Sequence, residues 1–140
     1  MIDPLAASIK IAGSGLEVQS ARLRVVAENL ANAQSTGAAP GADPYMRKTI
    51  TFESTLDELA GAELVHVKNI GRDSRPFRIE HDPGSPAADS KGFVKYPNVD
   101  TIMEMADLRE ANRSYEANLQ VIKQANNLSS MTLDLLRNAS

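Results

Sequence analysis

A seven-residue spacing of large aliphatic residues near the N-terminal end most constrains how this chain can fold. Four of them recur at intervals of seven positions: Ile9, Leu16, Leu23 and Leu30. They belong to a 4,3 pattern of nine residues from Leu5 to Ala33, of which all but Gln19 are apolar. A narrow apolar seam with this repeat is typical of a helix that packs against one partner helix as a coiled coil. Asp3, a good N-cap residue, and Pro4, which suits the first helical position, predict where this helix begins.

The C-terminal end carries a second and broader helical pattern. Thr101 and Glu104 match a capping box, with Asp100 favourable beside them, so a helix is expected to begin near residue 98. A first seam with 4,3 spacing comprises Met105, Leu108, Asn112, Tyr115, Leu119, Ile122, Asn126, Ser129, Leu133 and Leu136. A second seam beside it comprises Val121, Ala125, Leu128, Thr132 and Leu135. One partner helix cannot cover both seams, so the second is expected to remain uncovered by the first helix.

The segment between the two helical patterns is expected to form β-hairpins and extended arms. Four short runs alternate apolar and polar residues and are bounded by Gly, Pro, Asp or Asn: KTITFE, LVHVKNI, RPFRIEH and GFVKY. The sequence therefore predicts a mainly α chain with a small β-rich insert. Its segments are an N-terminal helix (1–33), a loop and hairpin segment (34–97) and a C-terminal helix (98–140), with the helices forming an antiparallel coiled-coil-like pair.

Asparagine is frequent in the C-terminal helical pattern, although it is a poor helix former. Asn112, Asn118, Asn126 and Asn127 all lie in a stretch that contains neither Gly nor Pro. A buried Asn at a seam position lowers stability but fixes the register and number of the partner helices. The alternative is that these residues lie at the solvated edges of a two-helix hairpin. The spacing leaves both interpretations open.

Charge and composition argue against several classes of function. The net charge is −3, and the arginines are interleaved with acidic residues, so no basic stripe for nucleic acid is expected. The chain contains no Cys, which excludes disulfides, thiol catalysis and Cys-ligated zinc. There is no run of about 18 apolar residues that could span a membrane. The N-terminus lacks the basic start and apolar region of a cleaved secretory signal.

Candidate catalytic and metal-binding residues are scarce. The two histidines are His66 and His81, and His81 with Asp82 is the one pair that could act as a base or a metal ligand. A surface His beside an Asp is far more often solvated, and no ligand set with the spacing of a metal site is present. The GSG at residues 13–15 lacks the Lys-Ser/Thr of a phosphate loop and is expected to be a flexible first turn. We therefore expect no catalytic, cofactor or metal site.

Two motifs give the chain a resemblance to a known family. GFVKYPNVDTIMEM followed by RSYEANLQVI resembles the C-terminal signature of the bacterial flagellar basal-body rod proteins, most closely of the proximal-rod members. AENLANAQSTG followed by PYMRK resembles the N-terminal signature shared by rod, hook and hook-associated proteins. The resemblance covers essentially the whole chain, with both motifs in the family's order.

The resemblance implies a structural subunit of the proximal rod that assembles helically into part of the drive shaft and export conduit. It implies no enzymatic activity and no cofactor. The implied partners are other proximal and distal rod subunits, components of the basal-body base and rings, and the flagellar type III export apparatus. The implied location is the periplasmic rod of the basal body, reached without cleavage of a signal peptide.

Combining the seams with the resemblance gives an expected assembly interface on the two helices. Its residues are Ile9, Leu16, Leu23, Asn29, Leu30, Asn32, Asn112, Tyr115, Asn118, Leu119, Ile122, Asn126 and Leu133. The alternative class is a helical-hairpin adaptor that binds one cytoplasmic partner. Such an adaptor would stay a defined small oligomer as its concentration rises, whereas a rod subunit would remain monomeric until it is templated.

Overall fold

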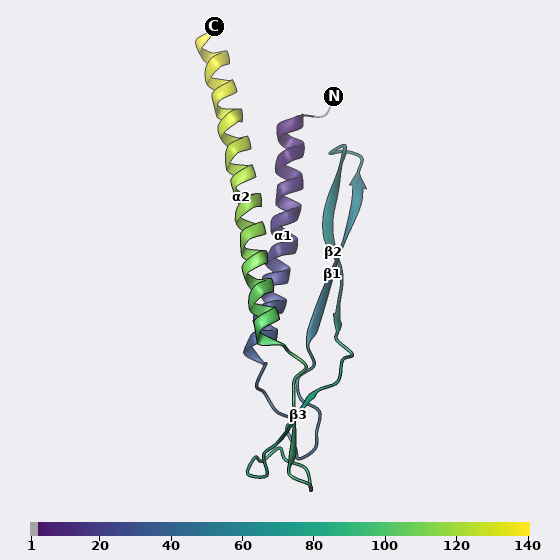
Figure 1. Ribbon diagram of the computed structural model, residues 1–140. Coiled ribbons are helices and arrows are strands. Elements are labelled where there is room, and N and C mark those ends of the chain that lie inside the picture. The colour runs from purple at the N-terminus through teal and green to yellow at the C-terminus, as the bar shows by residue number, and fades with distance from the viewer. Residues whose placement is uncertain (1–2) are drawn as a thin grey trace. The chain divides into compact units, whose positions relative to one another are not determined.

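The computed structural model describes residues 3–140 and consists of two long helices at the ends of the chain with four strands between them (Figure 1). In chain order the elements are α1 (Pro4–Ala31), β1 (Lys48–Asp57), β2 (Ala62–Arg72), β3 (Arg78–His81), β4 (Phe93–Tyr96) and α2 (Thr101–Asn138). This confirms the predicted mainly α chain with a small β-rich insert. Met1 and Ile2, which the predicted segment 1–33 includes, lie outside the described residues.

The strands form two separate two-stranded sheets, β1 with β2 and β3 with β4. Each of the four runs predicted from alternating residues overlaps one of these strands, and β1 and β2 extend beyond the predicted runs. β3 and β4 pair antiparallel, with Arg78 opposite Tyr96 and His81 opposite Phe93. β1 and β2 are joined by a tight turn in which the N–H of Gly61 donates to the carbonyl of Asp57 at 2.8 Å.

The chain divides into two compact units, and both helices contribute to each. The helix–hairpin unit comprises residues 3–22, 51–68 and 110–140, which are the first part of α1, the outer part of the β1–β2 hairpin and most of α2. The junction unit comprises residues 23–50 and 69–109, which include the end of α1, the β3–β4 sheet and the start of α2.

α1 and α2 pack side by side in opposite directions (Figure 1). In the helix–hairpin unit, Gly15 lies against Asn118, and the Arg22 guanidinium pairs with the Glu110 carboxylate at 3.4 Å. In the junction unit, Asn29 meets Glu104. As the chain advances along α1, its contacts move towards the start of α2. The predicted antiparallel pair is therefore confirmed.

The sequence led us to expect a flexible first turn at the GSG of residues 13–15, and this expectation is wrong. The GSG lies within α1, and Gly15 is buried. A Cβ at position 15 would lie 2.6 Å from the Asn118 Nδ2, so a larger residue here would force the Asn118 side chain to shift. Among the described residues, a Cβ added at Gly13 would meet nothing within 4 Å.

The first seam predicted on α2 is offset from the buried side of this helix. The buried positions of α2 are Glu104, Ala111 and Ala125, and the half-buried Asn118 occupies the remaining position of this seven-residue repeat. Predicted seam residues Met105, Asn112 and Leu133 are exposed, whereas Tyr115 and Ile122 are half-buried. Because the helices approach closely, small or well-packed side chains occupy the centre of the contact and larger ones flank it.

The helix starts agree with the sequence for α1 and differ for α2. The Asp3 carboxylate accepts the N–H of Leu5 at 3.0 Å, as expected of an N-cap. At α2, Asp100 fills this role, because its carboxylate accepts the N–H groups of Ile102 and Met103. The predicted capping box of Thr101 and Glu104 is therefore wrong. The Glu104 side chain instead binds Arg47 and Asn29.

Candidate functional site: a buried polar junction

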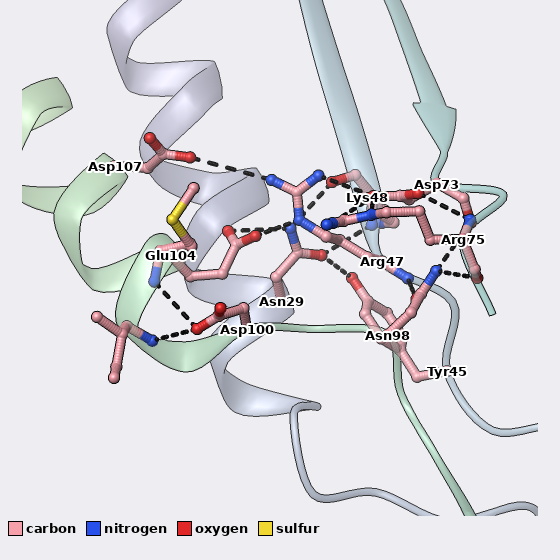
Figure 2. A network of polar contacts seen from close by, with 12 residues as sticks. Asn29, Tyr45, Arg47, Lys48, Asp73, Arg75, Asn98, Asp100, Glu104 and Asp107 are labelled. Carbon is pink, nitrogen blue, oxygen red and sulfur yellow. Dashed lines mark hydrogen bonds and ion pairs between the residues drawn. The ribbon is translucent and has the colours of Figure 1, made fainter. Parts of the chain in front are cut away.

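A buried network of polar side chains holds five segments of the junction unit together (Figure 2). We call it the polar junction. Its residues are Asn29 near the end of α1, Arg47 and Lys48 at the start of β1, Asp73 after β2, Asn98 before α2 and Glu104 in the first turns of α2.

Asn29 is the centre of this network, and it exposes none of its surface. Its Nδ2 donates to the carbonyl of Lys48 at 2.9 Å and to the Glu104 carboxylate at 3.3 Å. Its Oδ1 accepts the Tyr45 hydroxyl at 2.7 Å and the N–H of Lys48 at 2.8 Å. An amide has two donors and one oxygen with two lone pairs, so all of its hydrogen-bonding capacity is used. The side chain thus fixes both backbone groups of the first residue of β1 to α1.

Glu104 is also fully buried, and Arg47 provides its counter-charge. One carboxylate oxygen of Glu104 accepts the Arg47 Nε, and the other accepts the Asn29 amide. The Arg47 guanidinium also pairs with the Asp73 carboxylate at 3.3 Å and lies 3.9 Å from the Asp107 carboxylate. A buried carboxylate is tolerated only when it is paired and hydrogen-bonded in this way.

Asp73 and Asn98 complete the polar junction on the other side of Arg47. The Asp73 carboxylate binds the Arg75 guanidinium at 2.6 Å and accepts the Arg75 N–H at 2.9 Å. These hydrogen bonds from Arg75 lower the pKa of Asp73 from 3.8 to about 2. Asn98 accepts the N–H of Arg47 at 2.8 Å and donates to the carbonyls of Asp73 and Arg75, both at 2.9 Å.

A less buried shell surrounds Lys48 and Tyr45. The Lys48 ammonium binds the Glu28 carboxylate, and this hydrogen bond lowers the pKa of Glu28. Burial raises the pKa of the Tyr45 hydroxyl, so the phenol stays neutral and donates to Asn29. The Arg72 guanidinium lies 5.4 Å from the centre of the Tyr45 ring, a cation–π distance.

The geometry of the polar junction suits a structural clamp. Its two fully buried side chains, Asn29 and Glu104, form their hydrogen bonds with other groups of the same chain. Neither presents an atom to solvent from which a substrate could be bound. The clamp ties both helices to the strand that opens the insert.

The residues expected at the assembly interface lie in different environments. Asn29 is buried in the polar junction. Those that are half-buried are Ile9, Leu16, Leu23, Leu30, Asn32, Tyr115, Asn118, Leu119 and Ile122. Those that are exposed are Asn112, Asn126 and Leu133. Asn118 turns back to its own helix, donating to the carbonyl of Ser114 at 3.0 Å, and packs against Gly15.

Helical periodicity missed the polar junction, although both sequence motifs contain parts of it. Arg47 and Lys48 lie in PYMRK, and Asn98 and Glu104 lie in YPNVDTIMEM. His66 and His81 are both exposed and lie outside it. The His66 imidazole lies 3.6 Å from the Glu53 carboxylate, and the His81 ring packs edge-on against Phe93 at 5.0 Å.

Within residues 3–140, neither helix is both long and apolar enough to cross a membrane.

Comparisons with known proteins agree with the two sequence motifs. Residues 9–38 match the family model described as flagella basal body rod protein, and residues 90–135 match the C-terminal model of the flagellar basal body rod FlgEFG proteins. The chain is 63% identical to the flagellar basal-body rod protein FlgC of Agrobacterium fabrum, over 97% of this chain and 98% of that protein.

Two more distant relatives carry the same description. The FlgC protein of Escherichia coli O6:H1 is 41% identical, over 89% of this chain and 92% of that protein. The FlgC protein of Borreliella burgdorferi is 34% identical, over 95% of this chain and 98% of that protein. The chain therefore belongs to the FlgC family of flagellar basal-body rod proteins.

Proposed function

We propose that this chain is a structural subunit of the proximal part of the basal-body rod, where copies assemble helically with other rod proteins. In this role it forms part of the drive shaft and of the conduit through which later subunits are exported. The chain would have a structural role and catalyse no reaction, in keeping with its family.

One observation carries the proposal beyond the family assignment. α2 presents a row of large apolar side chains that α1 does not cover, spaced by seven residues: Val121, Leu128 and Leu135. They expose 43%, 52% and 70% of their surface, respectively. Large apolar side chains left exposed along one side of a helix are typical of a protein interface. Seven-residue spacing suits another helix as the partner, as neighbouring subunits would supply.

The polar junction supports the same role. A drive shaft must transmit force between subunits without its segments sliding past each other. Within the junction unit, Asn29, Arg47 and Glu104 join the two helices to the start of β1 through charged and fully used hydrogen bonds. Hydrogen bonds to charged groups are roughly twice as strong as neutral ones.

The partners and location follow as part of this proposal. The chain would pass through the flagellar type III export apparatus without signal cleavage and reside in the periplasmic rod. Other proximal and distal rod subunits would pack against its helices, and components of the base and rings would be its further neighbours. Family membership is the support for these assignments.

A substitution on the exposed row of α2 tests the proposal. The Leu128→Asp chain is produced in cells from which the natural chain has been removed. The substitution would place a charge where a neighbouring helix packs, at a cost of several kcal/mol per contact. We expect such cells to make the protein but to lose swimming, with the chain missing from purified basal bodies. Gln120→Asp, at an exposed polar position of the same helix, is the matched control. Normal swimming of the Leu128→Asp cells would refute this role for α2.

A further inference from the structure

We propose that the tip of the β1–β2 hairpin of one copy inserts into a lysine-rimmed pocket on the β3–β4 sheet of a second copy. The hairpin tip consists of Leu56, Glu58 and Leu59. The pocket is lined by Gly41, Ile79, Asp89, Lys91, Phe93 and Lys95 and has a volume of about 350 Å³. The inference rests on the proposed function, which requires that subunits assemble, and it names one contact that neighbouring copies would make.

The two leucines of the hairpin tip are exposed beside a turn that hydrogen bonds stabilise. Leu59 exposes 87% and Leu56 exposes 66% of its surface. The Asp57 carboxylate accepts the N–H groups of Leu59 and Ala60 at 2.9 and 3.1 Å, and Gly61 takes the left-handed conformation that closes the turn. Since the turn is fixed by these bonds, the two leucines remain in solvent instead of folding back onto the chain.

The segment that carries the hairpin tip is acidic. Residues 53–63 contain four carboxylates and no basic residue. Asp57 is paired with Lys10 at 3.6 Å, and Glu53 lies near His66. Among residues 3–140, Glu58 forms no ion pair, so its charge is available to another molecule.

The pocket has the opposite character. Its apolar lining residues are Ile79, which exposes 61% of its surface, and Phe93 on the paired strand. Lys91 has no ion-pair partner within residues 3–140, and Lys95 pairs with Asp43 at 3.0 Å. Asp89, the one acid of the lining, is engaged in holding the turn, because its carboxylate accepts the N–H groups of Lys91 and Phe93. Two lysines against one carboxylate give the lining a net positive charge.

Shape and charge together identify a second copy as the occupant. The exposed leucines of the hairpin tip, with the Glu58 carboxylate beside them, complement the apolar pocket with the Lys91 ammonium beside it. Such complementarity of charge guides two partners into one register. The two surfaces differ, so a copy whose tip is bound still has its own pocket free. A head-to-tail contact of this type repeats from copy to copy and generates a ring or an open helix.

Cross-linking in assembled basal bodies tests the contact. The chain has no Cys, so Leu59→Cys with Phe93→Cys introduces the only two thiols. Basal bodies from cells that carry this doubly substituted chain are treated with a short bismaleimide, and the chain is detected on a denaturing gel. We expect a ladder of linked chains, because each copy would be joined at its tip and at its pocket. Leu59→Cys with Ser74→Cys, an exposed position outside the pocket, is the matched control and should give no ladder.

A second measurement needs no substitution. Carbodiimide treatment of natural basal bodies should join the Glu58 carboxylate to the Lys91 amine, and peptide mapping should find this link between copies. Absence of both links from basal bodies that contain the chain would overturn the contact and leave the proposed function intact. Links within a single chain would also overturn it. Absence of the natural chain from purified basal bodies would instead refute the proposed function itself.

Discussion

The Asn29 amide and the Glu104 carboxylate meet at 3.3 Å with no exposed surface, although 75 positions separate them in the sequence. One belongs to the end of α1 and the other to the start of α2. Their contact closes the junction unit, because Asn29 also holds the backbone of Lys48 and Glu104 also holds Arg47. The stability of this unit should therefore depend on the pair.

Removal of the Asn29 side chain should destabilise the fold strongly. Asn29→Ala leaves the Lys48 backbone and one Glu104 oxygen without their buried partner, and each unsatisfied group costs about 1–3 kcal/mol. We expect a loss of about 3 kcal/mol in urea unfolding of the purified chain. Asn32→Ala is the matched control, since within residues 3–140 the Asn32 side chain bonds only to the Glu28 carbonyl of its own helix. Equal effects of the two substitutions would contradict the role given to Asn29.

Acid should weaken the fold through Asp73. Its pKa is lowered from 3.8 to about 2 in the folded state, so the unfolded chain takes up this proton first as the pH falls. The stability that Asp73 contributes is therefore complete well above pH 3.8 and is lost as the pH falls towards 2. Asp73→Asn should lower the melting temperature at pH 7 and flatten its decline in acid. Melting curves of both chains from pH 7 to 2 check this, and parallel declines would contradict it.

The two glycines of α1 should respond in opposite directions to alanine. Gly13→Ala meets nothing within 4 Å and should gain up to about 1 kcal/mol from helix propensity. Gly15→Ala would place its Cβ 2.6 Å from the Asn118 amide and should destabilise the helix pair. Asn118→Ala should rescue Gly15→Ala by removing the clash. Equal stabilisation by both alanines would show that the helices do not approach closely at Gly15.

Sequence patterns predicted the elements well because each depends on local chemistry. Asp3 and Pro4 define the start of α1, and alternating residues identify all four strands. The sides of the helices that pack depend instead on how closely two helices approach. Periodicity placed Met105 and Asn112 in the α2 seam, whereas the close approach at Gly15 favours Ala111 and Asn118.

The polar junction could not be predicted from spacing for a related reason. Asn29 lies beside the apolar seam of α1, and Glu104 fits a capping box in the sequence. Their roles depend on bonds to Lys48 and Arg47, which come from a different part of the chain. A spacing rule describes only one element at a time, so it cannot detect a partner on another.

The exposed asparagines of α2 should control assembly more than folding. Asn126 is exposed in the single chain, next to the buried Ala125. Asn126→Leu would extend the first predicted seam, beside Ile122 and Leu133, and is expected to cause premature self-association, because it strengthens helix pairing while loosening register. Asn126→Ala should only weaken assembly. Motility plates and sedimentation of the purified variants separate these cases, and wild-type swimming with a monomeric state for both would exclude Asn126 from the interface.

Imaging of basal bodies from cells that make this chain tests its assignment as a rod subunit most directly. A reconstruction of the rod should contain the chain, with Leu128 and Leu135 of α2 buried against a helix of a neighbouring subunit. Both side chains are exposed in the single chain, so their burial would be a consequence of assembly. A rod that lacks the chain, or one in which this side of α2 still faces solvent, would contradict the account.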